Sequence, residues 1–249
     1  MVVCDWNGTL FRDVMEEAYF VALCRRVYFR ALFGGRIATA ARQSVAGLRC
    51  CLAYAAARLR PTRRLEYVRR ILESLNGPFL RGLPLADVEQ YTRHYARRIQ
   101  SRLDGRLIGP LRAVRERTGV RLGVVSSGCR IGIQAALELA GLSPDFILAN
   151  EFRTDGRTVS GFDFALADNK WEALTAFLDL HGVGADEVMY VGDSPQDQQC
   201  LHNVGLPVVS FWATDEAKRE LARTCGAFVP ADRGDFERHL AAAVGGPSG

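Results

Sequence analysis

The chain contains 249 residues, of which 48% are hydrophobic and 24% charged, and its formal net charge is +4. These values are ordinary for a soluble protein with a sizeable core, and the length suits one domain with an insertion or two small domains. The seven cysteines are an odd number without a Cys-x-x-Cys pair, so we interpret them as reduced core residues and expect no zinc site. Because the sequence lacks an apolar run of 18 residues and a signal peptide before its first strand, we expect a cytoplasmic protein.

A short buried strand is predicted at the N-terminus. Val2, Val3 and Cys4 are apolar and favour β-structure, and they lead directly into Asp5. The Asn7-Gly8-Thr9 stretch that follows predicts a turn. An acid at the carboxyl end of a buried strand lies where open α/β sheets bind their ligands.

Residues 14–105 differ from the rest of the chain in charge. They contain 17 arginines, no lysine and 7 acidic residues, a net charge of +10, whereas residues 1–13 carry −1 and residues 106–249 carry −5. Between Ala18 and Leu65 there are ten arginines and no acid. The arginines are interspersed with apolar residues at helical spacing, namely Ile37, Ala41, Val45, Leu48, Leu52, Ala55 and Leu59. We predict an all-helical unit of about four to five helices, with Asp87 capping the last long helix towards Ser101.

After Gly105 the predicted elements alternate between strands and helices. Helices are predicted over residues 107–117, 131–142, 169–181, 196–204 and from 233 onward. Strands are predicted over residues 121–125, 146–149, 187–191 and 208–211, and residues 151–164 form a hairpin around Asp155-Gly156. This alternation predicts βαβ units in a mostly parallel sheet with helices on both faces.

The first strand must belong to that sheet, so the helical unit is inserted into the α/β domain. We therefore predict a Rossmann-like core formed by residues 1–13 and 106–249, with residues 14–105 as a helical, arginine-rich cap.

Polar side chains follow the ends of the predicted strands. Ser126-Ser127-Gly128 follows one strand, Asp193 and Asp197 follow another, and Lys170 opens a helix. Hydroxyl groups and free amides in a turn before a helix can hold phosphate oxygens, and a lysine beside them neutralises a transferring phosphoryl group. Asp193, Asp197 and Asp5 would repel one another without a cation, and a cluster of oxygen ligands suits Mg²⁺.

The order of these residues resembles the four motifs of the haloacid dehalogenase superfamily of phosphohydrolases. Asp5-x-Asn7-Gly8-Thr9, Ser126, Lys170 and Gly192-Asp193-x-x-x-Asp197 match the motifs in order and span nearly the whole chain. The 121 residues from Asp5 to Ser126 leave room for a helical cap after the first motif, whereas the 44 residues from Ser126 to Lys170 leave none for a second large cap. This layout is similar to the subgroup that contains phosphoserine phosphatase.

The resemblance implies a role for each matched residue. Asp5 would attack phosphorus and form an aspartyl-phosphate. The phosphoryl oxygens would be held by Ser126, Ser127, Gly128 and Lys170. Mg²⁺ would be held by the Asp5 carboxylate, the backbone carbonyl of Asn7 and Asp193, with Asp197 positioning its water shell. The implied function is a Mg²⁺-dependent phosphohydrolase acting on a small phosphorylated metabolite.

Asn7 departs from the family pattern, in which phosphatases usually carry an aspartate at this position. That aspartate protonates the leaving oxygen and later deprotonates the attacking water, which a carboxamide cannot do. Three hypotheses follow: hydrolysis of substrates with a good leaving group, such as acyl, enol or aryl phosphates; a slow phosphatase in which another acid or a water substitutes; or a pseudoenzyme that binds phosphorylated ligands. An asparagine engineered to trap a complex is a fourth.

Two relatives without the second aspartate are disfavoured. Phosphonoacetaldehyde hydrolase shares the Asp-Trp start seen at Asp5-Trp6, but it needs a cap lysine, and residues 14–105 contain none. The haloacid dehalogenases themselves need no metal, so the presence of both Asp193 and Asp197 favours Mg²⁺ and phosphate. They stay a minor alternative.

The arginines of residues 14–105 admit several interpretations. They would steer an anionic substrate into the cleft, lay a basic amphipathic face on acidic lipid or nucleic acid, or form an ordinary solvated helix surface. We favour the solvated surface and substrate steering over peripheral membrane contact, and we expect no nucleic-acid partner. The sequence leaves the oligomeric state open.

Overall fold

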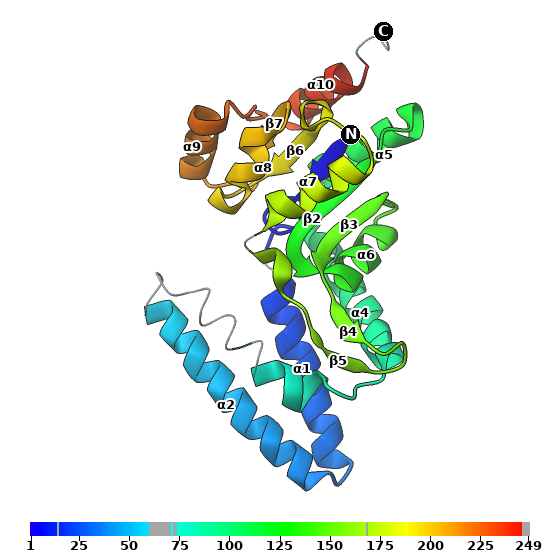
Figure 1. The fold of residues 1–249 in the computed structure, drawn as a ribbon, viewed down its shortest axis with the longest axis vertical. Helices are drawn as coiled ribbons and strands as arrows, with labels where there is room; N and C mark the ends of the chain where they lie inside the picture. Colours follow the sequence, from blue (N-terminus) through cyan, green and yellow to red (C-terminus); the bar gives the residue numbers. More distant parts are fainter. Residues whose placement is uncertain (14, 60–70, 72–73, 168, 246–249) are drawn as a thin grey trace. The chain divides into compact units, whose positions relative to one another are not determined.

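The structure is a computed structural model that describes residues 1–13, 15–59, 71, 74–167 and 169–245. The chain divides into two compact units, each of which is described by itself (Figure 1). Unit 1 comprises Met1–Met15, Arg93–Asn150 and Ala165–Gly249, and unit 2 comprises Glu16–Thr92 and Glu151–Phe164. The units differ from the predicted segments in three places, since Met15 and residues 93–105 belong to unit 1 and the hairpin segment 151–164 to unit 2. The assignment of catalytic core and cap stays a prediction.

Unit 1 is built on a five-stranded parallel sheet in the order β3-β2-β1-β6-β7. Its strands are β1 (Val2–Cys4), β2 (Leu122–Cys129), β3 (Phe146–Asn150), β6 (Met189–Gly192) and β7 (Leu206–Val209). β1 is central, and its Val3 pairs with Gly123 on one side and Tyr190 on the other. A central parallel strand is covered on both faces, which explains why all three β1 residues are apolar. The predicted strands are confirmed, and β2 runs on to Cys129.

Helices cover both faces of this sheet, as predicted. They are α5 (Gly105–Thr118), α6 (Arg130–Leu139), α7 (Lys170–Leu180), α8 (Gln198–Asn203), α9 (Asp215–Cys225) and α10 (Arg233–Val244). Helix α5 precedes β2 and α6 connects β2 to β3, so both belong to connections on the β3 side of β1. Helix α7 precedes β6 and α8 connects β6 to β7, on the other side of β1. Because parallel crossovers are right-handed, the two pairs of helices lie on opposite faces.

Helix α9 is absent from the sequence prediction, although its ends carry ordinary signals. The Thr214 hydroxyl accepts a hydrogen bond from the Ala217 amide at 3.1 Å, and Asp215 and Glu216 occupy the first turn. Gly226 ends the helix with a φ of 64°.

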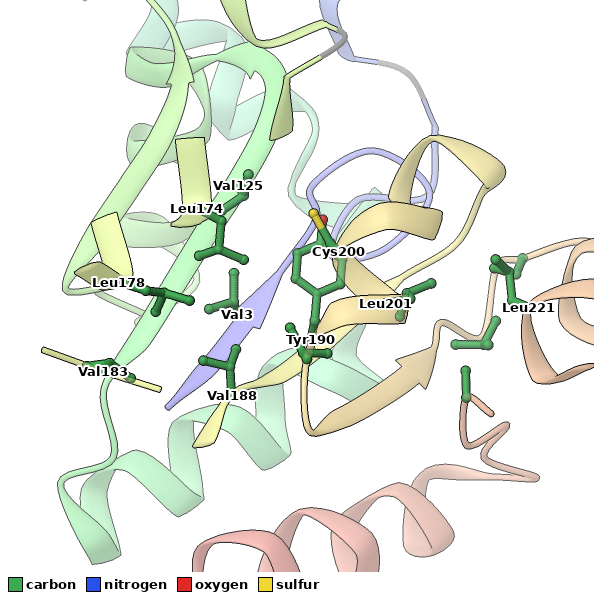
Figure 2. Packing of buried hydrophobic residues seen from close by; sticks show 14 residues of the cluster. Val3, Val125, Leu174, Leu178, Val183, Val188, Tyr190, Cys200, Leu201 and Leu221 are labelled. Atoms are coloured by element: carbon green, nitrogen blue, oxygen red, sulfur yellow. The ribbon is translucent and has the colours of Figure 1, made fainter. Parts of the chain in front are cut away.

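One face of the sheet carries a continuous apolar core (Figure 2). Val3, Val125 and Tyr190 from the strands are fully buried against Leu174 of α7 and Leu201 of α8. The cysteine prediction holds in part: all seven are free thiols, of which Cys4, Cys24, Cys129 and Cys200 are buried, whereas Cys51 is exposed.

Unit 2 contains a pair of long helices, α1 (Met15–Phe33) and α2 (Ile37–Leu59), joined by a short turn. The single-turn π-helix η2 (Asn76–Leu80) follows, and then α4 (Leu85–Arg98), whose last residues belong to unit 1. The buried Tyr19 hydroxyl lies 2.7 Å from Thr92 Oγ1, which ties α1 to α4. Asp87 is not the cap of α4, because it lies within the first turn, where it forms an ion pair with Arg30 of α1. The predicted number of helices falls partly on residues outside the described ranges.

The predicted hairpin is confirmed as β4 (Phe152–Thr154) and β5 (Val159–Phe162), with a four-residue loop between Thr154 and Val159. Its place in unit 2 was not predicted, and backbone pairing explains it. Gly82 N donates to Val159 O at 2.7 Å, and Leu85 N donates to Arg157 O at 2.8 Å. Sequence periodicity cannot show this pairing, because the partners are more than 70 residues apart in the chain.

Candidate active site

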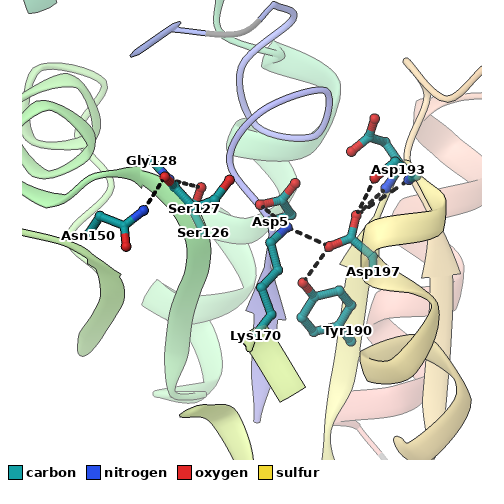
Figure 3. Close-up of polar contacts among 10 residues, drawn as sticks. Asp5, Ser126, Ser127, Gly128, Asn150, Lys170, Tyr190, Asp193 and Asp197 are labelled. Carbon is teal, nitrogen blue, oxygen red and sulfur yellow. Dashed lines mark hydrogen bonds and ion pairs between the residues drawn. The ribbon is translucent and has the colours of Figure 1, made fainter. Parts of the chain in front are cut away.

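Asp5 lies at the carboxyl end of β1 and is 3% exposed. Its backbone N–H donates to Val191 O at 2.9 Å, so the pairing of β1 with β6 continues through this residue. The parallel register therefore holds the carboxylate at the edge of the sheet where β2 and β6 also end (Figure 3).

Lys170, the first residue of α7, is buried and lies between two carboxylates. Its Nζ is 2.9 Å from Asp5 Oδ1 and 2.8 Å from Asp197 Oδ1. Burial alone would lower the pKa of Lys170, but Asp5 and Asp197 raise it well above its ordinary value. The lysine is thus a fixed positive charge between the two acids.

Asp197 is fully buried and accepts hydrogen bonds on both oxygens. Its Oδ1 accepts from Lys170 Nζ at 2.8 Å and from the Tyr190 hydroxyl at 2.9 Å. Its Oδ2 accepts from the Asp193 amide at 3.2 Å, and from the amide and hydroxyl of Ser194 at 3.4 and 3.3 Å. With its lone pairs occupied in this way, Asp197 orients Lys170 and holds the turn that carries Asp193.

Asp193 contacts the turn after Asp5 at Gly8. Gly8 has a φ of +71°, and a Cβ added there would lie 2.2 Å from Asp193 Oδ2. Both the backbone conformation and the close approach therefore require glycine. The Asn7-Gly8 turn is closed by a hydrogen bond from Gly8 N to Phe11 O at 2.7 Å.

These contacts gather three carboxylates around a single lysine. Asp5, Asp193 and Asp197 each offer an oxygen within 4.8 Å of the others. Burial and the neighbouring carboxylates raise the pKa of Asp193 from 3.8 to about 8. Burial, opposed by Lys170 and supported by Asp197, raises the pKa of Asp5 from 3.8 to about 7. When all three are ionised, these carboxylates carry more negative charge than Lys170 balances.

This donor set fits a hard divalent cation. All three side chains offer carboxylate oxygens, and a bound cation would stabilise the ionised forms of Asp5 and Asp193, whose pKa values are raised mainly by burial. Asp5 and Asp193 are the side chains best suited as ligands, because both oxygens of Asp197 already accept hydrogen bonds.

Ser126, Ser127 and Gly128 lie at the end of β2, beside β1. Ser126 is fully buried, and its hydroxyl accepts a hydrogen bond from Gly128 N at 3.0 Å while its own proton is still a donor. The Ser127 carbonyl accepts a hydrogen bond from the Asn150 side chain at 2.5 Å. The side chain of Ser127 is partly exposed, so it is better placed than Ser126 to meet a ligand.

Comparisons with known proteins agree with this arrangement. The family of haloacid dehalogenase-like hydrolases matches residues 2–202, from β1 through α8. The chain belongs to the haloacid dehalogenase-like hydrolase family. No curated protein sequence matches it.

Solved structures with the same fold have low sequence identity to this haloacid dehalogenase-like hydrolase. The cytosolic 5'-nucleotidase IIIB bound to cytidine superposes with a TM-score of 0.65 at 17% identity, over 98% of this chain and 84% of the other. A protein of unknown function from Bordetella pertussis Tohama I gives 0.61 at 16% identity, over 92% and 96%. A probable phosphoserine phosphatase from Vibrio cholerae gives 0.57 at 14% identity, over 99% and 67%. These likenesses confirm the predicted fold class.

The structure brings together four of the predicted site residues of this haloacid dehalogenase-like hydrolase: Asp5, Lys170, Asp193 and Asp197. Asn7 lies on the adjoining turn, which pairs with Phe11, and Ser126–Gly128 lie at the adjoining strand end, where Gly128 N donates to the Ser126 hydroxyl and Asn150 donates to the Ser127 carbonyl. Trp6 is fully buried and stacks on Phe11 at 5.5 Å between ring centroids, so it is a packing residue.

Sequence reasoning did not identify the residues that support this site. Tyr190 and Ser194 hold Asp197, and Asn150 holds Ser127. Ser210, which is fully buried after β7, donates to Gly8 O at 2.6 Å and accepts from Trp212 N at 3.1 Å. Asn150 and Ser210 are polar residues at the ends of apolar strands, the same signal that identified Asp5.

Proposed function

We propose that this haloacid dehalogenase-like hydrolase is a Mg²⁺-dependent phosphohydrolase that acts through an aspartyl-phosphate on a small phosphorylated metabolite. The observation that carries the proposal is the buried ion pair of Asp5 with Lys170 inside a cluster of three carboxylates. Burying a charge-paired acid at the end of a strand costs desolvation free energy, and such groups are typical of active sites.

In the proposed reaction, a carboxylate oxygen of Asp5 attacks phosphorus. The bond from phosphorus to the leaving oxygen breaks, and water then hydrolyses the aspartyl-phosphate to release inorganic phosphate and restore Asp5. Lys170 would neutralise negative charge on the phosphoryl group, and its raised pKa keeps it protonated throughout. The donors available at the end of β2 are the Ser127 side chain and the nearby backbone amides.

Bound Mg²⁺ would neutralise charge on the phosphoryl oxygens and on the clustered acids. Asp5, Asp193 and the backbone carbonyl of Asn7 would hold it. Asp197 would keep Lys170 and the Asp193 turn in place, and orient the water shell of the ion.

Asn7 sets the substrate class that we propose. Its carboxamide cannot donate a proton to the leaving oxygen, so we propose substrates whose leaving group needs little acid assistance, such as acyl, enol or aryl phosphates. A slow phosphatase that uses a substitute acid is a second possibility. The competing proposal from another class is a pseudoenzyme that binds phosphorylated ligands, which Asn7 also favours.

A substrate panel separates the two classes. Purified protein with Mg²⁺ is assayed for phosphate release from an aryl phosphate, an acyl phosphate and several alkyl phosphomonoesters. We expect turnover that decreases from acyl and aryl to alkyl substrates. Asp5→Asn should abolish it, whereas the matched control Asp179→Asn, at an exposed acid of α7, should not change it.

Two outcomes of this assay would contradict the proposed phosphohydrolase activity or its mechanism. If none of the substrates turns over while calorimetry shows that phosphate or a phosphomonoester binds, the protein is a binding protein. Turnover that survives Asp5→Asn would contradict the aspartyl-phosphate mechanism.

A further inference from the structure

Helix α2 of unit 2 has a buried face and, opposite it, an exposed apolar face. Ala40, Gln43 and Ala46 lie on its buried face. The opposite face is a stripe of apolar residues at helical spacing, all exposed, which we call the α2 stripe: Ile37, Ala41, Val45, Leu48, Leu52, Ala55 and Leu59. Its five large members are between 54% and 83% exposed. A solvated helix surface would not be continuously apolar over the full length of the helix.

The α2 stripe continues into the turn that joins α1 to α2. Phe33, the last residue of α1, is 82% exposed, and Leu32 beside it is 41% exposed. The turn between the helices contains Gly34 and Gly35. The exposed apolar surface therefore runs from the tip of the helix pair along the whole of α2.

Arginines border this surface. Arg42 and Arg49 are exposed on α2, seven residues apart and therefore on one side of the stripe, and Arg36 is exposed at the tip. The sequence has no acid between Ala18 and Leu65. Arg42 and Arg49 also line a hollow of about 480 Å³ whose wall includes Val45 of the stripe and Ser74. Guanidinium groups beside an apolar wall suit the phosphate of an amphiphile.

The combination of an apolar stripe with bordering arginines favours one kind of binding partner. A second copy of the chain would bring the same arginines together over a stretch of sequence without acids, which like-charge repulsion opposes. A nucleic acid would pair with the arginines but leave the aliphatic stripe in water. A bilayer surface with anionic phospholipids accepts both, since apolar side chains enter the acyl boundary and arginines bind headgroup phosphates.

We propose that the α2 stripe and its arginines dock unit 2 on a membrane surface rich in anionic phospholipids, with α2 lying in the plane of the interface. Among the described helices, none has the length and apolar character needed to cross a membrane. A helix with one apolar stripe bordered by arginines is expected to lie on the membrane surface. This proposal departs from the preference drawn from the sequence, which favoured a solvated surface and substrate steering, because the α2 stripe is both exposed and apolar.

The test is a vesicle co-sedimentation experiment with the full chain. Vesicles of phosphatidylcholine alone are compared with vesicles of equal parts phosphatidylcholine and phosphatidylglycerol, at low and high salt. We expect binding to the anionic vesicles at least tenfold stronger than to the neutral ones, and weaker binding at high salt. The measurement does not depend on catalytic activity.

Two double variants separate the apolar and charged contributions. Leu48→Gln/Leu52→Gln removes part of the stripe and should weaken binding to the anionic vesicles. Arg42→Gln/Arg49→Gln should weaken this binding about 20- to 30-fold, which corresponds to about 1 kcal/mol per arginine. The matched controls Leu139→Gln/Leu180→Gln and Arg117→Gln/Arg219→Gln alter exposed residues of unit 1 and should bind like the parent. Circular dichroism confirms that each variant is folded.

Three results would overturn the proposal. One is absence of binding to the anionic vesicles. Another is equal loss of binding in the stripe variants and in their controls. The third is a stable dimer in light scattering that Leu48→Gln/Leu52→Gln dissociates, because the stripe would then be covered by a second copy.

Discussion

Asn7 occupies the position where the sequence resemblance leads us to expect an aspartate, and in the mechanism that we propose its carboxamide gives the leaving group no acid assistance. Asn7→Asp should therefore raise kcat/KM on alkyl phosphates by about 10²- to 10⁴-fold, the contribution of a typical general acid or base. The gain on aryl phosphates should be smaller, because their leaving groups need less assistance. Phosphate release measured with both substrate types checks the prediction.

A uniform gain on all substrates would contradict the leaving-group explanation.

The side-chain position of Gly8 is already filled by the Asp193 carboxylate. Gly8→Ala would place a methyl group in the position of the Asp193 carboxylate and would strain a backbone with φ at +71°. We expect Mg²⁺ affinity to fall at least tenfold, measured by calorimetry. Gly119→Ala is the matched control, because Gly119 has a φ of +68° and open space around its Cβ position. It should lose about 1–2 kcal/mol of stability and keep its Mg²⁺ affinity. Equal effects of the two variants would contradict this account.

Among the elements, the end of β7 supports the turn after β1. The buried Ser210 hydroxyl bonds both Gly8 O and Trp212 N, so Ser210→Ala leaves two backbone groups without this partner. We expect the Mg²⁺ concentration for half-maximal activity to rise about tenfold, as for other residues that orient metal ligands. Ser160→Ala removes an exposed hydroxyl that bonds a backbone carbonyl in the hairpin, and should leave it unchanged. A lower melting temperature without a change in Mg²⁺ dependence would assign Ser210 a purely structural role.

Elements with local signals could be predicted from the sequence, and elements fixed by distant pairing could not. The apolar run before Asp5 and the strand before Asp193 predicted β1, β6 and their meeting point, because parallel strands end at one edge. The hairpin β4–β5 was predicted from Asp155-Gly156, but its pairing with residues 82–85 depends on backbone groups that any sequence supplies. Asp87 resembled a cap, but the helix begins at Leu85.

The residues of the candidate site also divide into those with a local sequence signal and those that only the structure reveals. The charged residues Asp5, Lys170, Asp193 and Asp197 could be predicted because they follow predicted apolar strands or open a predicted helix. Tyr190 is part of an ordinary strand pattern, and only the structure shows that its hydroxyl reaches Asp197. Exposure of the α2 stripe was also invisible, since helical spacing does not reveal which face is covered.

At the scale of the whole molecule, the clustered acids couple stability to pH. Folding raises the pKa of Asp5 to about 7 and that of Asp193 to about 8, from 3.8. The folded state therefore binds these protons more tightly than the unfolded state, and the associated stability is lost as pH rises through about 7 to 8. We expect the chelated protein to melt at a lower temperature at about pH 9 than at about pH 6, by several degrees.

Mg²⁺ should restore the melting temperature at high pH, because it binds the ionised acids. Asp193→Asn should flatten the pH dependence of the chelated protein. A chelated protein that is more stable at the higher pH would contradict the electrostatic description of the site.

The central claim is that Asp5 accepts the phosphoryl group, and mass spectrometry tests it most directly. Because Asn7 cannot activate water, the aspartyl-phosphate should accumulate during turnover of an aryl or acyl phosphate with Mg²⁺. Acid quenching and proteolysis should then show a mass gain of one phosphoryl group on the peptide that contains Asp5, absent in Asp5→Asn and reduced in Asn7→Asp. Phosphate release with the phosphoryl group on another residue, or with none bound to the protein under single-turnover conditions, would contradict the claim.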